Sequence, residues 1–404
     1  MRLTERTVIS QRHPRYDELR HLCHLSKNLY NSSLYDVRQH FFNTGKYLTW
    51  QSQRPLFSGS NPDYLALPAK VAGEVLKDVS RDFSSFFALL KKKRKGNYHG
   101  SVHIPKYKDK GGFHVVTIPR DAISKKVVAE GEFFEHVICP TSINLPVLSR
   151  HKDIVMVRIV PRYQCVEVQV VYEVPDVETK EDNHRYLAID PGVDNFATVT
   201  TNTGDPPVIY SGKSIKSVNR WYNKNLAYYR SLLPEGVRTS KRIQKMSDKR
   251  TRRIDWFMHN ISSHIVNHAV SNDINTIIIG RNKKWKQDTN MGRRNNQKFV
   301  SIPHHRFVKM LEYKCALHGI RFVETEESYT SKCSFPDREN VGKHDSYAGR
   351  RKKRGLFISS DGTHINADVN GSFNIMRKVV PDEYVYSKGV VDGAVHPFMV
   401  TEFS

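Results

Sequence analysis

The stretch LAIDPGVDNFATVTT, residues 187–201, decides the fold of the C-terminal half of the chain. Its apolar start is typical of a short buried strand that ends at Asp190. Pro191 and Gly192 then form a tight turn, and FATVTT is rich in residue types that favour a second strand. This pattern predicts a carboxylate held at a strand end, where it is open to solvent or to a metal. Taken alone, a DPG sequence also fits an ordinary turn.

The residues that follow alternate between strand and helix patterns. Strands are predicted at VIYS (208–211), INTIIIG (274–280) and IRFVET (320–325). Helices are predicted over 215–270 and 302–319, and HINADVNGSFNIMRKVV is predicted as a loop that leads into a final helix after Asp368. This alternation predicts an α/β domain, which we place at residues 181–404.

The N-terminal half is of a different type. Amphipathic helices are predicted over 16–42 and 69–90, separated by a loop rich in Ser, Pro and Gly at 52–64. Strands are predicted at 6–10 and 114–119, and as a hairpin of 153–161 with 165–175. We expect an α+β region in which residues 1–10 and 96–180 form a small β-barrel and residues 11–95 form an inserted helical domain. The polar segment 174–185 marks the main domain boundary.

The charge predicts a polyanionic partner. The chain has 64 Lys and Arg residues against 41 Asp and Glu residues, a net charge of +23, and 38% of its residues are hydrophobic. A folded chain this basic most often binds nucleic acid, because neutralised phosphates release counterions. The alternative is a merely soluble basic surface. Five scattered cysteines without a CxxC pair argue against disulfides, and no segment predicts a membrane span or a signal peptide.

Two basic stretches are candidate nucleic-acid contacts. Residues 91–110 mix Lys and Arg with Tyr98 and Tyr107, and GRRKKRG covers 349–355. A charge run is usually a solvated face, but the interleaved aromatics favour nucleic acid. The candidate nucleic-acid-binding residues are Lys91, Lys92, Lys93, Arg94, Lys95, Lys106, Lys108, Arg350, Arg351, Lys352, Lys353 and Arg354.

A second carboxylate, Asp368, precedes the last helix, where it also fits an N-cap. The order of elements between Asp190 and Asp368 resembles an RNase H-like domain of the RuvC type. That resemblance implies three carboxylates that hold two divalent metals, and hard Mg²⁺ prefers carboxylate oxygens. In the RuvC pattern the third is a Glu at the end of the fourth strand, but Gly280 stands there, followed by Arg281 and Asn282.

The next predicted strand ends with Glu326 and Glu327. Because that strand would lie beside the fourth one, either glutamate would reach the same metals from one strand over. We therefore predict a catalytic, metal-binding triad of Asp190, Asp368 and one of these two glutamates. Adjacent residues in a strand face opposite sides, so only one is expected to serve. We favour Glu327, which directly precedes the turn SYTSK. The alternative is that both are surface glutamates of an inactive enzyme.

The motifs LAIDPGVDNFATVTT, IIIGRNKKWKQ, TEESYTSKCSF and HINADVNGSFNI together resemble TnpB, the transposon-encoded RNA-guided nuclease family related to type V CRISPR effectors. IIIG with TEESYTSK resembles a subgroup with a rearranged RuvC glutamate. The resemblance implies a wedge barrel, a helical recognition domain and a RuvC-like nuclease domain with a zinc-finger-like insertion at about 331–364. Because its CxxC pairs are missing, we expect a degenerate insertion without Zn²⁺; Cys333, His344 and His364 are its scattered candidate ligands.

The resemblance also implies the activity and partners. We expect a DNA endonuclease that takes its guide RNA from the transposon end and cuts double-stranded DNA beside a short flanking motif. Two Mg²⁺ ions would serve it, with Mn²⁺ as a substitute. We expect a monomer or dimer in a bacterial or archaeal cytoplasm, near the nucleoid and with no membrane partner. The basic stretch 215–254 would grip an RNA–DNA duplex, whereas its Trp221, Tyr222, Tyr228 and Tyr229 are expected to pack.

Three alternatives stay open. The first is a catalytically inactive RNA-guided DNA-binding repressor, which the absence of a Glu at position 280 favours. The second is an RNase H-like transposase or recombinase that works without RNA. The third is a basic RNA-binding protein with no enzymatic role, which the positions of Asp190 and Asp368 argue against.

Overall fold

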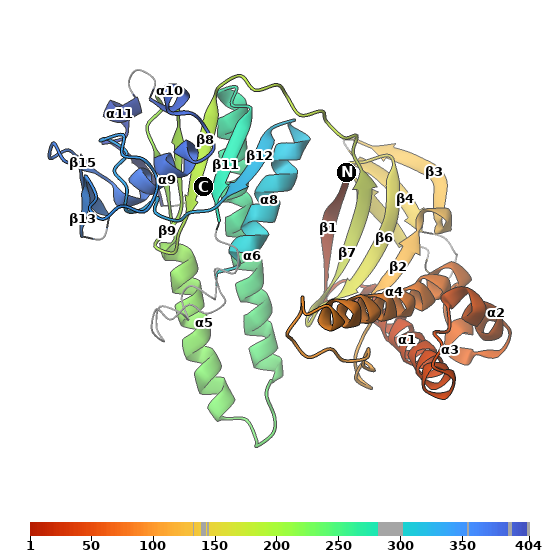
Figure 1. The fold of residues 1–404 in the computed structure, drawn as a ribbon. Coiled ribbons are helices and arrows are strands. Elements are labelled where there is room, and N and C mark those ends of the chain that lie inside the picture. Colours follow the sequence, from red (N-terminus) through yellow and green to blue (C-terminus); the bar gives the residue numbers. More distant parts are fainter. Residues whose placement is uncertain are drawn as a thin grey trace. The chain divides into compact units, whose positions relative to one another are not determined.

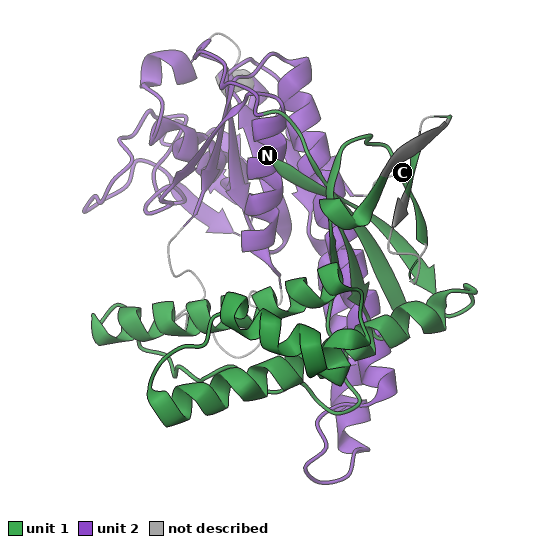
Figure 2. Cartoon of the chain, turned by 90° about the vertical axis from the view of Figure 1, so that its right-hand side faces the viewer, with its two compact units in different colours: residues 1–175 green, residues 176–404 purple. Residues whose placement is uncertain are grey.

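A computed structural model describes the whole chain except residues 132, 139–142, 144, 282–301, 354, 387–389 and 402–404. It divides the chain into two compact units, residues 1–175 and 176–404 (Figure 2). The division falls inside the polar segment 174–185. Two predicted residues, Asn282 and Arg354, lie outside the described residues.

Unit 1 contains a helical part and two antiparallel sheets (Figure 1). Its helices are α1 (Tyr16–Thr44), α2 (Trp50–Ser60), α3 (Pro62–Leu65) and α4 (Ala69–Arg94), with a 3-10 turn at Arg120–Ala122. Its strands are β1 (Arg2–Ser10), β2 (Val116–Pro119), β3 (Ile123–Glu130), β4 (Phe133–Ile138), β5 (Leu145–Ser149), β6 (Ile154–Pro161) and β7 (Cys165–Glu173). The predicted hairpin is confirmed as β6 and β7.

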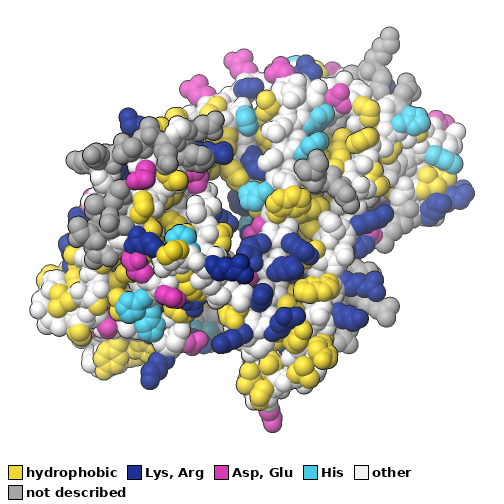
Figure 3. All heavy atoms as spheres, turned by 180° about the vertical axis from the view of Figure 1, so that it is seen from behind, with side chains coloured by type: hydrophobic (Ala, Val, Ile, Leu, Met, Phe, Trp, Pro, Cys, Tyr) yellow, Lys and Arg dark blue, Asp and Glu magenta, His cyan; other side chains and the backbone are white. Residues whose placement is uncertain are grey.

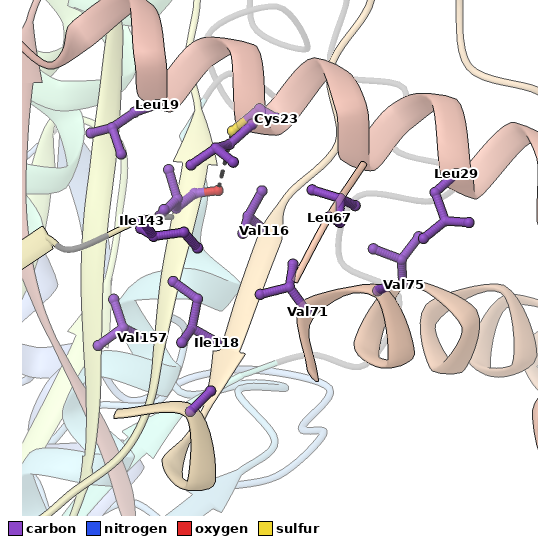
Figure 4. Packing of buried hydrophobic residues seen from close by; sticks show 14 of the residues in the cluster. Leu19, Cys23, Leu29, Leu67, Val71, Val75, Val116, Ile118, Ile143 and Val157 are labelled. Atoms are coloured by element: carbon purple, nitrogen blue, oxygen red, sulfur yellow. Dashed lines mark hydrogen bonds between the residues drawn. The ribbon is translucent and has the colours of Figure 1, made fainter. Parts of the chain in front are cut away.

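Hydrogen bonding joins the described strands of unit 1 into two sheets, in the orders β1-β7-β6-β2 and β3-β4-β5. One hydrophobic core lies between the larger sheet and the helices (Figure 4). Cys23 of α1 is fully buried there, and its thiol donates to the carbonyl oxygen of Ile159 in β6. Val71 and Val75 of α4 pack in the same cluster. Helices and sheet therefore stabilise each other by burying one continuous apolar surface.

The predicted loop at 52–64 is wrong, because this segment forms α2 and α3. The side chain of Gln53 is buried; it donates to the carbonyl oxygen of Ser33 and accepts from the Ser33 hydroxyl. Phe57 is buried one turn further along. The side chains of Thr49 and Asn61 cap the two helices. Packing against α1 and good caps thus outweigh the weak helix propensity of Ser, Gly and Pro.

Unit 2 is built around a six-stranded sheet. The strands of the main sheet are β8 (Tyr186–Pro191), β9 (Asn195–Thr201), β10 (Val208–Ser211), β11 (Thr276–Gly280), β12 (Arg321–Thr325) and β16 (Phe398–Val400). A smaller sheet contains β13 (Arg350–Lys353), β14 (Leu356–Ile358) and β15 (His364–Ile365). The helices of unit 2 are α5 (Lys213–Ser231), α6 (Lys241–Ser271), α8 (His304–Leu317), α9 (Ala367–Arg377), α10 (Asp382–Val385) and α11 (Val390–Gly393). The strands predicted at 208–211, 274–280 and 320–325 are confirmed. The helical stretch predicted over 215–270 consists of two helices, α5 and α6, separated by residues 232–240.

The main sheet has the order β12-β11-β8-β9-β10-β16 and is covered on both faces (Figure 1). Leu187 and Ile189 of β8 pack with α6 and α8 on one face. Tyr186 and Ala188 pack with α9 on the other. Alternate side chains thus enter two separate cores, which is why the strand reads as a continuous apolar run.

The insertion before α9 carries the small sheet β13-β14-β15. Its Cys333 thiol donates to the carbonyl oxygen of Gly342, and His344 Nε2 lies 2.7 Å from the carbonyl oxygen of Asn340. The carboxylate of Asp337 accepts from the backbone N–H and the hydroxyl of Ser360. Hydrogen bonds thus join the two loops, 333–339 and 359–361, at the segments where the resemblance implies CxxC pairs.

Candidate active site

Three parallel strands bring their carboxyl ends to one edge of the main sheet. β11 pairs in parallel with β8 on one side and with β12 on the other. Asp190 lies at the end of β8, and Gly280, in register with Thr325, ends β11. Side chains that follow these strands are therefore held close together, at the edge where open α/β sheets bind their ligands.

The two glutamates follow β12 rather than end it, because the strand stops at Thr325. The predicted extension of this strand to Glu326 and Glu327 is therefore wrong, and strand alternation does not apply to this pair. The side chain of Glu326 is 64% exposed, accepts from the Ser328 hydroxyl at 2.7 Å and lies 3.5 Å from Lys378 Nζ. Lys378 Nζ also lies 3.2 Å from the Ser328 hydroxyl oxygen. Glu326 thus ties the turn to the end of α9 at the surface.

Glu327 turns the other way, over Gly280. A Cβ added at Gly280 would lie 2.6 Å from Glu327 Cγ, 2.8 Å from Glu327 Oε1 and 2.6 Å from Ile375 Cδ1. Such distances are far below an ordinary carbon–carbon contact of ~3.5–4.0 Å. The Glu327 side chain therefore occupies the space that a side chain at position 280 would need.

A second glycine brings α9 close to Asp190. A Cβ added at Gly371 would lie 2.9 Å from Asp190 Oδ2, so only glycine lets the helix approach the carboxylate this closely. The hydroxyl of Ser372, the next residue, donates to the carbonyl oxygen of Ala188 in β8 and so fixes the helix against the strand. The sequence NGSF thus positions α9 directly beside the end of β8.

Asp368 lies in the first turn of α9, but it is not the N-cap. That position belongs to Asn366, whose side chain accepts from the backbone N–H of Asp368. The side chain of Asp368 is free of the capping role and turns to two partners. Asn195 Nδ2 donates to Asp368 Oδ2 at 2.6 Å, and the Arg351 guanidinium lies 3.5 Å from Asp368 Oδ1.

The pKa values link these carboxylates electrostatically. Burial raises the pKa of Asp190 well above its usual range, and the negative charges of Glu327 and Asp368 raise it further, while Arg351 opposes them. Burial likewise raises the pKa of Glu327 to about 7, against the lowering effect of Lys378. The pKa of Glu326 is lowered by its hydrogen bond from Ser328 and by Lys378. Buried, mutually repelling carboxylates are typical of sites that bind a cation.

We tested whether the residues fit the divalent ions that the resemblance implies. Within the part of the chain that the structure describes, no three His, Cys, Asp or Glu side chains are grouped closely enough to enclose one ion. Mg²⁺, however, is usually bound by one or two carboxylates with waters and substrate oxygens. The negative charges of Glu327 and Asp368 both act on the buried carboxylate of Asp190. Their chemistry and charge fit such ions without an all-protein cage.

The predicted basic residues lie in separate places. Lys91, Lys92, Lys93 and Arg94 form the exposed last turn of α4, and Lys95 caps it. Lys106 is exposed, whereas Lys108 is half-buried, with its Nζ 4.2 Å from the ring centre of Tyr30. Arg350, Arg351, Lys352 and Lys353 are exposed along β13, and of these Arg351 reaches Asp368.

Sequence reasoning missed three polar contacts of the site: Asn195 and Arg351 on Asp368, and Lys378 beside the glutamates. Asn195 follows the DPG turn in DNF, so its position at the start of the strand after Asp190 was the available signal. Arg351 was predicted as a nucleic-acid contact and not as a partner of Asp368. Nothing in the spacing of Lys378 relates it to Glu326.

Unit 1 carries an open basic groove between α2 and α4. It is lined by Trp50, Lys77, Ser80, Arg81, Ser84 and Ser85. Lys77 Nζ lies 5.1 Å from the ring centre of Trp50 and donates to Glu74, which also accepts from Arg81. The groove thus combines an aromatic face, hydroxyls and charges of both signs. The groove was not predicted, because Trp50 lies between the predicted helix 16–42 and the predicted loop 52–64, in residues that were assigned to no element.

Comparisons with known proteins agree with this architecture. The family OrfB_IS605, described as a probable transposase, matches residues 169–286, and the TNB domain of Cas12f1-like proteins matches residues 304–375. The TnpB-like protein ORF457 of Acidianus two-tailed virus is 23% identical over 90% of this chain and 83% of its own length. A chain in the cryo-EM structure of a Cas12f1–sgRNA–target DNA complex is 14% identical, with a TM-score of 0.60 over 91% of this chain and 83% of that chain.

The fold is therefore similar to that of the Cas12f1 chain in this complex. The two family models, the curated relative and the solved structure all support a TnpB-type protein. Proteins of this family are generally nucleases. Among the described residues, no helix is long and apolar enough to cross a membrane.

Proposed function

We propose that the chain is an RNA-guided DNA endonuclease that hydrolyses phosphodiesters in a RuvC-like site formed by Asp190, Glu327 and Asp368. The main observation in support of this proposal is the position of the Glu327 side chain directly above Gly280. Position 280, where the RuvC pattern has a glutamate, holds a glycine. The side chain of Glu327, from the segment that follows β12, occupies the space that a side chain at position 280 would need. This supports the rearranged form of the RuvC triad.

In this proposal the three carboxylates hold two divalent ions, Mg²⁺ or its substitute Mn²⁺. When bound, such ions supply an activated water and stabilise the charge that develops on the phosphate. Asn195 orients Asp368 by donating to its Oδ2. Arg351 brings a positive charge to the same carboxylate from the edge of β13, where Arg350, Lys352 and Lys353 are free to bind the strand being cut. Zn²⁺ has no part in the proposal.

The nucleic-acid partners follow from the charge. A guide RNA from the transposon end would supply sequence specificity by base pairing, and the protein would contact phosphates through its exposed cations, including residues 91–95. We assign the reading of the short flanking DNA motif to the Trp50 groove, because Lys77 and Arg81 offer donors to base edges and its serine hydroxyls offer both donors and acceptors. Residues 1–10 with 96–180, and residues 11–95, would be the wedge and recognition domains of this nuclease.

The experiment is guided cleavage of a plasmid. The protein is purified with the transposon-end RNA, and bound RNA is sequenced to define the guide. A matched target with a library of flanking sequences is then incubated with Mg²⁺, with Mn²⁺ and with EDTA. Cleavage that needs the guide, the metal and one flanking motif supports the proposal. Guide-dependent binding without cleavage in either metal would refute it.

A second candidate is the inactive RNA-guided repressor, favoured by the missing glutamate at position 280 and by the Arg351 guanidinium beside Asp368, where it partly neutralises the site. It predicts guide-dependent DNA binding and no cleavage in the same experiment. An RNase H-like transposase that works without RNA would act on transposon ends in the absence of any guide.

A further inference from the structure

The hairpin of α5 and α6 carries about half of the chain's excess positive charge. Residues 213–253 contain thirteen Lys and Arg residues against two Asp and Glu residues. Figure 3 shows Lys and Arg side chains gathered over the projecting hairpin and hydrophobic side chains toward its tip. A surface of this charge favours a polyanion over a second copy of the same basic chain.

Two of the four aromatic residues of α5 hold the hairpin together. The guanidinium of Arg250 lies 5.1 Å from the ring centre of Tyr222, and that of Arg242 lies 5.5 Å from the ring centre of Tyr229. Arg250 also donates to Asn219 Oδ1 of α5. These tyrosines and arginines are spaced by about two helical turns, so they form repeated cation–π contacts between the two helices. The prediction that these tyrosines pack agrees with their positions.

The other two aromatic residues are largely exposed, although the ring of Tyr228 has an edge contact with that of Tyr229. Trp221 is 47% exposed and Tyr228 is 59% exposed, contrary to the expectation from sequence. Lys224, also exposed, stands between them on the same side of α5, because residues three, four and seven apart share one helical face. The two rings are about 10 Å apart along the helix. The helix thus presents an exposed aromatic–lysine–aromatic stripe.

We propose that this stripe, Trp221–Lys224–Tyr228, binds unpaired nucleotides of the guide RNA by stacking their bases on the two rings while Lys224 contacts the phosphates. Base faces are available to aromatic side chains only where bases are not covered by their neighbours, so a continuous duplex offers nothing to these rings. A partner that used the charge alone would need no exposed aromatics. The proposal rests on the proposed function only in naming a guide RNA as the source of the nucleotides.

The test separates stacking from charge. Full-length protein freed of nucleic acid is titrated with a labelled single-stranded RNA of about twelve nucleotides, within the site sizes usual for such proteins, and with a duplex of the same length. The double variant Trp221→Ala with Tyr228→Ala is expected to bind the single strand about tenfold or more weakly and the duplex as wild type does. Its dependence of log Kd on log salt should keep the wild-type slope, whereas Lys224→Gln should reduce that slope.

The matched control keeps the rings: Trp221→Phe with Tyr228→Phe is expected to bind within about threefold of wild type, because base stacking tolerates any aromatic ring. Circular dichroism of each variant checks that the hairpin is intact. Ultraviolet crosslinking in the assembled complex with target DNA should join the α5 segment to unpaired positions of the guide RNA.

Unchanged single-strand binding by the alanine variant, or an equal loss for duplex, would overturn the proposal. So would crosslinks to DNA alone, or a loss of self-association in light scattering without a loss of RNA binding, which would assign the stripe to a second copy of the chain. The result is independent of cleavage. If the wild-type protein never cuts DNA but the alanine variant selectively loses single-strand binding, only the proposed nuclease activity is refuted. If the wild-type protein cuts DNA and the alanine variant binds single-stranded RNA normally, only the proposed role of the stripe is refuted.

Discussion

Substituting Gly280 by alanine should slow the proposed guided cleavage by displacing Glu327. The added Cβ would lie 2.6 Å from Glu327 Cγ, whereas an ordinary contact needs ~3.5–4.0 Å. The Glu327 side chain must therefore move by about 1 Å, and Ile375 must give way too. A displacement of about 1 Å at a catalytic group costs on the order of 100-fold in rate, and overpacking costs about 1–3 kcal/mol of unfolding free energy. We expect both losses.

The assay is single-turnover cleavage of a guided target in Mg²⁺, paired with urea unfolding of the same preparations. Gly342→Ala is the matched control, since a Cβ added at Gly342 meets no atom within 4 Å. A Gly280→Ala protein that folds and cuts at the wild-type rate would show that Glu327 does not act from the space above Gly280.

A second variant at the same position tests the reverse direction. Gly280→Glu should not improve the wild-type chain, because Glu327 already fills the space. In the background Glu327→Ala that space is vacated, and Gly280→Glu is expected to restore part of the lost cleavage by returning a carboxylate from β11. Equal inactivity of Glu327→Ala with and without Gly280→Glu would count against an exchange of carboxylates between the two positions.

Four further outcomes are expected. Glu327→Gln should lose cleavage by about 100-fold or more while Glu326→Gln stays near wild type, because only the first side chain is buried in the site; similar rates would place neither there. Asp190→Ala and Asp368→Ala should each abolish cleavage but keep guided DNA binding in a gel-shift assay, since they remove a metal ligand and no phosphate contact. Burial raises the pKa of Glu327 to about 7 from 4.5, so between these pH values the folded protein keeps a proton that the unfolded chain releases. The unfolding free energy of the metal-free protein should therefore fall as pH rises through this window, by at most roughly 3 kcal/mol. The variant Glu327→Gln should remove this dependence on pH. Changing residues 91–95 to Ser should weaken assembly with RNA at physiological salt and leave the ends of the cut product unaltered.

The main sheet of unit 2 was predictable because local signals and burial agree there. β8 and β11 are buried on both faces, so their sequences are continuous apolar runs with sharp ends at Asp190 and Gly280. The position of β12 beside β11 followed from the alternation of strands with helices. In contrast, α2 could not be predicted, because its stability comes from Gln53 and Phe57 packing against residues distant in sequence.

The carboxylates of the site were predictable one by one, but their partners were not. Asp190 and Asp368 follow from their places at a strand end and a helix start. Asn366 is the N-cap of α9, so the carboxylate oxygens of Asp368 are available to Asn195 and Arg351. This arrangement depends on the exact residue at which the helix begins. Helix ends are the least certain part of a sequence-based assignment. The contact between Arg351 and Asp368 needs the insertion to fold back, which no local pattern encodes.

The choice between Glu326 and Glu327 shows what a strand pattern cannot decide. Alternation favours neither once β12 stops at Thr325, because both residues then lie in a turn. The two glutamates differ in their relation to Gly280, which pairs with Thr325 on the neighbouring strand. Gly280 has no side chain, and Glu327 fills the space that such a side chain would occupy. A chain with side chains at both 280 and 327 would be overpacked, and one with neither would lack a third carboxylate. The two positions are therefore physically coupled, and the meaning of Gly280 depends on a residue 47 positions further along the chain.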